Sequence, residues 1–329
     1  MTSKEALELA TKYAPIFAQK VSDEWKVADQ IAPVDFAGNI KDIVDNPQKL
    51  GKLEEDAKIA AKVYYSVCET STHYFLIYAV YHVLDWWKRF EPDDIYNYIR
   101  DMLDEHIHDM EGALLVVTKY PEGLVDGLVT VAHNNFYLYT EPRKPKEKPG
   151  EYEKAFENSL IIAKFNETVD GNIWIDKKTE RVKLYIESKG HGMRGDWNHW
   201  GPGDEIWYYR PEEETSKPGT IDKSEKKNTQ VQTYRLVDIF QEGGLWDHRR
   251  KPSVFLQNKD GKWGFAYRDK HDQDKLKGGA ANPPWSWNDH NDTSPIGEIS
   301  TDPAGFIIRY AQGWGPVSTH YIYNPYLSI

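Results

Sequence analysis

The chain has 329 residues, of which 40% are hydrophobic and 13% aromatic, and its formal net charge is −11. A chain of this length and hydrophobic content can bury a substantial core, which excludes an intrinsically disordered protein. The acidic balance and the scattered basic residues argue against a nucleic-acid partner, because phosphate backbones are bound by clustered lysine and arginine side chains.

Neither a transmembrane segment nor a secretion signal is predicted. No apolar run approaches the ~20 residues that cross a bilayer, and the first residues lack an apolar signal core. The single cysteine, Cys68, excludes an intrachain disulfide and a cysteine zinc cage. We therefore expect a soluble protein, cytoplasmic as written or secreted if a leader has been removed. Its oligomeric state is not predicted.

The first predicted element is a short helix. Thr2 and Glu5 have the spacing of a capping box, and apolar residues recur at helical intervals as far as Phe17. Pro15 limits this helix, because an interior proline removes a backbone hydrogen bond.

Strand patterns begin at residue 62. Residues 63–67 and 74–82 follow a period of two on either side of a polar turn, which predicts a β-hairpin. Residues 92–104 carry apolar side chains at helical spacing, which predicts a second helix. Further strands are predicted at 109–118, 128–139 and 182–187.

These elements favour an α+β fold with an antiparallel β-sandwich core, peripheral helices and long loops. The core is expected at about residues 60–195. No segment outside this range has an obvious hydrophobic core of its own. We therefore expect one domain over residues 1–329, in which residues 196–329 decorate the sandwich.

Ligand-type side chains are densest at residues 105–111, with the sequence EHIHDME. Residues two apart on a strand share a face, so Asp109 and Glu111 would project together, whereas His106 and His108 could share the other face. The sequence alone does not choose between these sets. Carboxylates with one or two imidazoles suit Mg²⁺, Mn²⁺, Ca²⁺ or Zn²⁺, so we expect one divalent metal ion here.

Two isolated histidines follow, each beside a predicted strand. His133 precedes Asn134, and His191 lies between Gly190 and Gly192. Glycines permit close approach of the backbone to a ligand, and a strand end is a rigid platform for a reactive group. If the metal site is catalytic, either imidazole would act as general acid or base, because imidazole titrates near neutrality.

Four short motifs resemble the necrosis- and ethylene-inducing-like proteins and a vacuolar-protein-sorting-like family. Residues 105–111 are similar to the heptapeptide G-H-R-H-D-W-E of the first family and to the H-x-x-D-W-E core of the second. Residues 78–85 resemble an upstream Y-x-x-Y-F-P-K-D segment. Two further motifs match at residues 132–133 and 190–191, and residues 284–289 and 302–304 resemble the tail of the sorting-like group.

The resemblance implies a two-sheet β-sandwich with a divalent cation in an acidic cleft. The ligands that it implies are Asp85, His106, Asp109 and Glu111, and His108 is the reserve ligand. Met110 and Glu105 stand where the heptapeptide has tryptophan and glycine, and the toxin family's disulfide cannot form with one cysteine. These departures argue against cytolytic activity but retain the ligand types.

Two functions are compatible with these residues. In the first, the cation is catalytic, and the cleft hydrolyses an ester, phosphoester or glycosidic substrate with His133 and His191 as catalytic residues. In the second, the cation is structural or bridges a ligand. The protein is then a non-catalytic module that binds a small molecule, a glycan or a lipid headgroup through the tryptophan-containing loops at 196–200 and 285–290. The tryptophans of these loops are at least as well suited to pack onto the sandwich.

Overall fold

The computed structural model describes residues 1–23, 26–34, 60–83, 109–120, 123–140, 169–195, 204–212, 229–251, 255–257, 261–265, 281–291, 294–310 and 316–327. The first element, α1 (Ser3–Tyr13), begins at the predicted capping box. Thr2 Oγ1 accepts a hydrogen bond from the backbone N–H of Glu5 at 3.3 Å, and Glu5 Oε2 accepts one from the backbone N–H of Thr2 at 2.6 Å. The helix ends before Pro15, as predicted, and buries Ala6, Ala10 and Tyr13.

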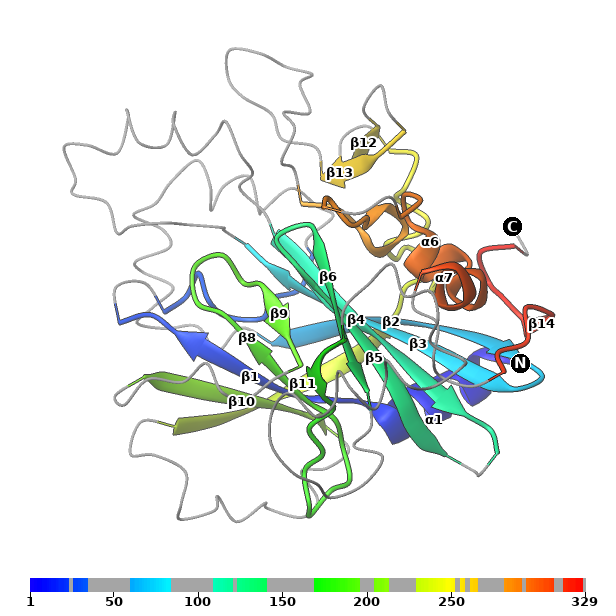
Figure 1. The fold of residues 1–329 in the computed structure, drawn as a ribbon. Helices are drawn as coiled ribbons and strands as arrows, with labels where there is room; N and C mark the ends of the chain where they lie inside the picture. Colours follow the sequence, from blue (N-terminus) through cyan, green and yellow to red (C-terminus); the bar gives the residue numbers. More distant parts are fainter. Residues whose placement is uncertain are drawn as a thin grey trace.

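One mixed sheet of 12 strands dominates the described chain (Figure 1). Its order is β7-β6-β5-β4-β3-β2-β11-β10-β1-β8-β9, and β14 pairs with β2. The strands are β1 (Ile16–Val21), β2 (Ala61–Thr70), β3 (His73–His82), β4 (Asp109–Thr118), β5 (Leu124–Ala132), β6 (Asn135–Thr140), β7 (Val169–Asn172), β8 (Lys183–Ile186), β9 (Met193–Arg194), β10 (Glu205–Pro211), β11 (Thr229–Asp238) and β14 (Tyr321–Tyr323).

The sheet combines an antiparallel meander with parallel additions. Strands β2 to β6 are joined by antiparallel pairs. Parallel pairs join β2 to β11, β11 to β10, β1 to β8 and β6 to β7. The sheet curls, so that β9 at one end lies against β4 and β5. The described chain is mostly β with few helices, which is compatible with the α+β prediction, but its main sheet is one curled mixed sheet instead of two facing antiparallel sheets. Period-two patterns do not reveal which distant strands pair, or in which direction.

Most predicted strands are confirmed. The predicted hairpin is β2 and β3, and the strands at 109–118 and 182–187 correspond to β4 and β8. The single strand predicted at 128–139 is wrong, because β5 and β6 meet there in a two-residue turn. His133 and Asn134 have φ of 53° and 59°, the left-handed conformation that such a turn requires at both positions. The helix predicted at 92–104 lies outside the described residues, and the single-domain prediction stays a prediction.

Side chains of β4 alternate between two hydrophobic cores. Ala113, Leu115 and Val117 face the inside of the curl, whereas Leu114 and Val116 face the opposite side. Because both faces are covered, the strand is apolar at successive positions. The inner core also receives side chains from α1, β1, β8, β10 and β11, including Ala10, Phe17, Leu184, Tyr209 and Tyr234.

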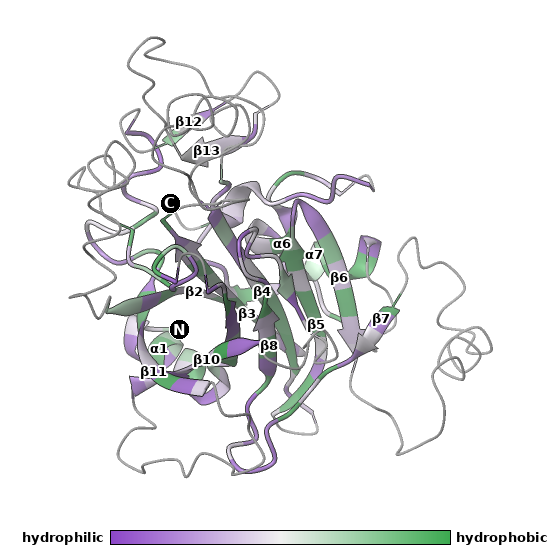
Figure 2. Cartoon of the chain, turned by 90° about the vertical axis from the view of Figure 1, so that its left-hand side faces the viewer, coloured by the Kyte–Doolittle hydropathy of each residue, from purple (hydrophilic) through white to green (hydrophobic). Residues whose placement is uncertain are grey.

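The C-terminal segments cover the outer face of the sheet. They comprise the paired strands β12 (Phe255–Gln257) and β13 (Trp263–Phe265), the 3-10 helix η2 (Pro284–Ser286), α6 (Glu298–Thr301) and α7 (Pro303–Arg309). On β6, Phe136 packs edge-on against Phe306 and Tyr310, with ring centroids 5.7 and 6.0 Å apart. In the view of Figure 2, α6 and α7 lie over β5 and β6, both of which carry hydrophobic residues. None of the described helices is long and apolar enough to span a membrane.

Candidate functional site

The carboxylates of the predicted motif continue the inner face of β4. Asp109 and Glu111 have the same parity as Ala113, so the apolar inner core ends in two acidic side chains. Both are buried, with 4% of Asp109 and 5% of Glu111 exposed. His82 on β3 lies opposite Asp109 in the strand register. Buried charges of this kind are stable only with partners of opposite charge or hydrogen bonds.

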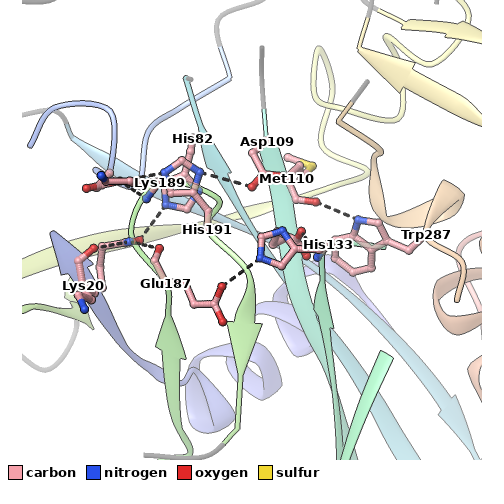
Figure 3. Close-up of polar contacts among 12 residues, drawn as sticks. Lys20, His82, Asp109, Met110, His133, Glu187, Lys189, His191 and Trp287 are labelled. Carbon is pink, nitrogen blue, oxygen red and sulfur yellow. Dashed lines mark hydrogen bonds and ion pairs between the residues drawn. The ribbon is translucent and has the colours of Figure 1, made fainter. Parts of the chain in front are cut away.

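His191 is the charged partner of Asp109. Its Nδ1 lies 3.4 Å from Asp109 Oδ2, its Nε2 lies 3.2 Å from Asp29 Oδ1, and its side chain is 0% exposed (Figure 3). Burial opposes a charge on the ring, but the carboxylates of Asp109 and Asp29 outweigh it and raise the pKa of His191 to about 9. At neutral pH the ring is therefore an imidazolium between two carboxylates.

Asp29 fixes the loop that carries His191. Its Oδ1 accepts a hydrogen bond from the backbone N–H of Lys189, and its Oδ2 accepts one from the backbone N–H of Ser22, both at 2.7 Å. The side chain is fully buried. Sequence reasoning missed this residue, because Asp29 lies in a polar stretch without periodicity. No local pattern marks it as the partner of a histidine 162 residues away.

His82 is stacked on His191, with ring centroids 3.9 Å apart and planes 1° from parallel. Gln19 donates through Nε2 to the carbonyls of Lys20 and Glu187, both at 2.9 Å. Its Oε1 therefore faces His82 Nε2, at 2.9 Å, and accepts a hydrogen bond from it. Burial, with the charge of His191 beside the ring, lowers the pKa of His82 well below 6.5. His82 is thus neutral with its proton on Nε2, and its Nδ1 has no hydrogen-bond partner among the described residues.

These five side chains, which we call the buried cluster, are Gln19, Asp29, His82, Asp109 and His191. They come from the ends of β1, β3 and β4 and from two loops, and they close one end of the inner core. The cluster joins one charged and one neutral imidazole to two buried carboxylates.

His133 lies at the outer boundary of this cluster. Its backbone N–H donates to Glu111 Oε1 at 2.9 Å, and its ring Nε2 lies 3.0 Å from Glu187 Oε2. Its side chain is 47% exposed. Glu187 Oε1 also contacts Arg194 Nε at 3.3 Å. Burial would raise the pKa of Glu187, but the bond to His133 and the charge of Arg194 lower it. An ionised carboxylate therefore orients an accessible imidazole.

The glycines around His191 are needed for the position of His133. A Cβ on Gly190 would lie 2.6 Å from Cε1 of the His133 ring, and a Cβ on Gly192 would lie 2.8 Å from its Nε2. The imidazole of His133 thus packs directly on the backbone of the loop that carries His191. The group that approaches these glycines is thus a side chain of the protein itself, and their predicted role in the approach of a ligand stays a prediction.

A C-terminal wall completes the site. Asn134 Oδ1 accepts hydrogen bonds from Lys262 Nζ and Asn282 Nδ2, both at 3.1 Å, and its carbonyl accepts one from the backbone N–H of His290 at 2.7 Å. Lys262 is half-buried; burial lowers its pKa, and the charge of Glu111 acts in the opposite direction. The rim, as we name it, consists of His133, Asn134, Glu187, Arg194 and Lys262.

The tryptophans of the 285–290 loop are packing residues. Trp285 and Trp287 are 6% and 2% exposed. The indole N–H of Trp287 donates to the carbonyl of Met110 at 3.0 Å, and a Cβ on Gly112 would lie 2.4 Å from the Trp287 ring. Of the two roles considered for these rings, packing onto the sheet is the one observed, since they fill the interface between β4 and the C-terminal wall. The loop at 196–200 lies outside the described residues.

Backbone conformation also marks this region. His133, Asn134, Lys189 and His191 all have positive φ, between 52° and 73°. Non-glycine residues in this conformation are strained and occur more often at functional sites than elsewhere. No sequence pattern indicated this property.

Of the five predicted metal ligands, the structure describes two. Asp109 and Glu111 lie on one face of β4, as expected, whereas Asp85, His106 and His108 lie outside the described residues. Within the described ranges, no group of three or more histidine, cysteine, aspartate or glutamate side chains could hold a metal ion. The metal site and its full ligand set therefore stay a prediction.

The two predicted catalytic histidines both border the acidic end of β4. His191 is buried with both nitrogens facing carboxylates, and His133 is accessible. The roles of both in a reaction stay predictions. Sequence reasoning missed Asp29, Gln19, His82, Glu187 and Lys262. Only His82 carried a signal, since it ends the alternating run of β3.

No protein-family model matches the chain, and no curated protein matches it. Among solved structures it is similar to NLPPya in complex with glucosamine, at 12% identity over 59% of this chain and 68% of that chain, with a TM-score of 0.27. It is also similar to Necrosis and Ethylene inducing Protein 2 from the causal agent of cocoa's witches' broom disease, at 16% identity over 57% and 67% of the two chains, with a TM-score of 0.28. The second of these structures carries the name of the family that the motifs resemble. TM-scores of this size transfer neither ligand nor activity.

Proposed function

We propose that this chain binds one divalent cation at the start of β4 and uses it to hold an oxygen-bearing ligand at the rim. The observation that carries the proposal is the pair Asp109 and Glu111, two carboxylates buried side by side on one face of a rigid strand. Carboxylate oxygens are the ligands that Mg²⁺, Ca²⁺ and Mn²⁺ prefer, and an added imidazole also suits Zn²⁺.

The chemistry of the donor set fits a cation. Asp109 Oδ2 is buried and has no hydrogen-bond partner among the described residues, although it forms an ion pair with His191. Glu111 is oriented by the backbone N–H of His133. In metal sites, the carboxylates that bind the ion are usually held in place by hydrogen bonds from neighbouring groups, as Glu111 is here. Asp85, His106 and His108 are the proposed further ligands from the sequence.

The proposed ligand is a small molecule, a glycan or a lipid headgroup. Such ligands offer hydroxyl or phosphate oxygens to a hard cation, and the accessible side chains of the rim are hydrogen-bonding groups. The tryptophans at 285 and 287 take no part in this proposal, because they are buried against the sheet.

Hydrolysis is the second candidate function, and the pair His133 and Glu187 favours it. A divalent cation supplies Lewis-acid polarisation when bound. The imidazole of His133 is accessible on the rim and is oriented by a carboxylate at 3.0 Å, the arrangement of a general base. His191 is less suited to proton transfer, because it is already an imidazolium with carboxylates at both nitrogens. An ester, phosphoester or glycoside is the proposed substrate.

Metal binding is tested first on the purified protein. Elemental analysis is followed by removal of metal with a chelator and calorimetric titration with Mg²⁺, Ca²⁺, Mn²⁺ and Zn²⁺ in turn. We expect Asp109→Asn and Glu111→Gln each to abolish binding of the preferred cation. Asp176→Asn, which removes a carboxylate paired with Lys183 at the far end of β8, should leave binding unchanged. Equal binding by the wild type and both site variants would overturn the proposal.

Turnover is tested on the same preparations with a panel of esters, phosphoesters and glycosides. If the protein is a hydrolase, His133→Ala should lose about 10²–10⁴-fold in rate while retaining the cation. If no substrate is turned over by the metal-loaded wild type, the non-catalytic binding function is favoured.

A further inference from the structure

The buried carboxylates of the site are associated with cations that the chain itself supplies. Asp29 and Asp109 share the imidazolium of His191, at 3.2 and 3.4 Å. Glu111 and Lys262 are bound to adjacent residues, Glu111 to the backbone of His133 and Lys262 to the side chain of Asn134, and the charge of Glu111 opposes the burial that lowers the pKa of Lys262. A buried carboxylate is costly unless an opposite charge or a set of hydrogen bonds compensates it. His191 is thus the internal positive charge beside Asp29 and Asp109, and Lys262 is the positive charge on the side of Glu111.

Lys262 is held near Glu111 by a short chain of contacts. Glu111 accepts a hydrogen bond from the backbone N–H of His133, the next residue is Asn134, and Asn134 Oδ1 accepts a hydrogen bond from Lys262 Nζ at 3.1 Å. Asn282 donates to the same oxygen, so the acceptor is fixed from two sides. Lys262 directly precedes β13, and its side chain is half-buried. Its charge is thus positioned by the C-terminal wall.

We propose that Lys262 is a built-in counter-cation of Glu111, which keeps this carboxylate stable without a metal and lowers the affinity of the site for a divalent cation. The inference rests on the proposed function, because it concerns the same carboxylates. The ammonium and the incoming cation carry charges of the same sign in a partly buried region, where repulsion is weakly screened. A metal ion must therefore bind against the field of Lys262.

The experiment measures stability and cation affinity in the same variant. Lys262→Gln removes the charge but keeps an N–H donor for Asn134. We expect its metal-free melting temperature to fall by several degrees, about the effect of 1 kcal/mol in a domain. We expect its affinity for Ca²⁺ and Mn²⁺, each titrated alone by calorimetry, to rise about tenfold. A purely structural lysine would not produce this combination, because damage to the fold does not tighten metal binding.

Two control variants separate charge from packing. Lys262→Arg retains the positive charge and should bind both cations as the wild type does. Lys183→Gln removes a lysine that pairs with Asp176 at 3.0 Å away from the site, so it should lose stability without a change in affinity.

The outcomes distinguish the two proposals. If the wild type binds a cation and Lys262→Gln binds it equally or more weakly, the role of Lys262 is overturned and the metal site stands. If Lys262→Gln binds Ca²⁺ or Mn²⁺ and the wild type does not, the inference is supported, because Lys262 then prevents cation binding altogether. If neither protein binds Ca²⁺ or Mn²⁺, both the inference and the proposed metal site are overturned.

Discussion

The buried cluster and the rim each contain a histidine at a strand end with a left-handed backbone, yet the two histidines have different surroundings. His191 is 0% exposed and faces a carboxylate at each ring nitrogen. His133 is 47% exposed, and its ring Nε2 contacts the carboxylate of Glu187. The first ring is a permanent positive charge at neutral pH, whereas the second is accessible to a ligand. Burial and neighbouring charge, not residue type or local sequence, separate the two roles.

The acidic end of β4 is thus divided into an inner and an outer part. The cluster compensates the negative charge of Asp109 from inside, and the rim orients Glu111 and presents polar groups outward. Changes in the cluster should therefore act mainly on stability, and changes at the rim mainly on binding.

The largest effect is expected from Asp29→Ala. The change removes one carboxylate from the His191 imidazolium and leaves the backbone N–H groups of Ser22 and Lys189 without their acceptor. Breaking a buried ion pair from one side typically costs about 3–5 kcal/mol. Chemical denaturation measures the loss. Asp247→Ala is the matched control, since this exposed carboxylate accepts one backbone N–H and should cost about 1 kcal/mol. Equal losses in the two variants would contradict a paired charge at Asp29.

The two stacked histidines should make stability fall on both sides of a maximum in a plot against pH: His191 on the alkaline limb and His82 on the acid limb. The raised pKa of His191 gives stability that is complete below about 6.5 and is lost as the pH rises through about 9. The free energy involved is on the order of 3 kcal/mol. The pKa of His82 is lowered by burial and by the charge of His191, so its contribution is present above the unfolded value and is lost as the pH falls.

The metal-free protein should therefore be most stable near the unfolded pKa of histidine. Denaturation at a series of pH values, in chelator, measures the profile. His82→Phe keeps a ring in the stack but cannot titrate, so it should flatten the acid limb and leave the alkaline limb. An unchanged acid limb in this variant would assign that limb to other groups.

A smaller effect, about 1–3 kcal/mol, is expected from Gly190→Ala. The added methyl would lie 2.6 Å from the ring of His133, so either the loop or the ring must move. The double variant with His133→Ala should recover most of the loss, because the obstructing ring is gone. Denaturation of the four proteins forms a double-mutant cycle. If Gly190→Ala cost the same free energy of unfolding with and without the His133 ring, a clash with that ring would not be the cause of the loss.

The strands could be predicted where their residues alternate or are continuously apolar. The hairpin of β2 and β3 and the apolar β4 follow from side-chain periodicity, and the capping box identified α1. The turn at His133 was missed because it uses two non-glycine residues with positive φ. One parallel partner of β11, the strand β2, lies far away in the sequence, and local patterns contain no information on such a pair.

The site could be predicted only in its local part. The prediction that Asp109 and Glu111 share one face is confirmed, because the alternation of side chains is a property of a single strand and needs no knowledge of its neighbours. Asp29, Gln19 and Lys262 reach the site from three distant segments, so only the folded chain brings them together. The role of the tryptophans in the C-terminal loop stayed open for a related reason: an aromatic ring in a loop-like sequence serves equally well to bind a ligand or to pack against a sheet.

The smallest effect on stability is expected at the rim, from Glu187→Ala. The carboxylate pairs with His133 and Arg194 at 3.0 and 3.3 Å, but its side chain is 32% exposed. Water can replace part of what such a pair provides, and exposed ion pairs contribute about 0–1 kcal/mol. Denaturation should therefore show a loss below about 1 kcal/mol, well under that of Asp29→Ala.

The same variant should nevertheless alter function, because the imidazole of His133 loses the group that orients it. If the protein is a hydrolase, turnover should fall in Glu187→Ala while the cation stays bound, and Glu187→Asp should restore part of it. If it is a binding module, ligand affinity should change modestly instead. Arg194 also packs over the Tyr137 ring, with its Cζ 3.7 Å from the ring centroid. Because this contact does not involve Glu187, Arg194 should stay in place in the variant. A loss of several kcal/mol would remove the distinction between cluster and rim, since Glu187 would then stabilise the fold as Asp29 is expected to do.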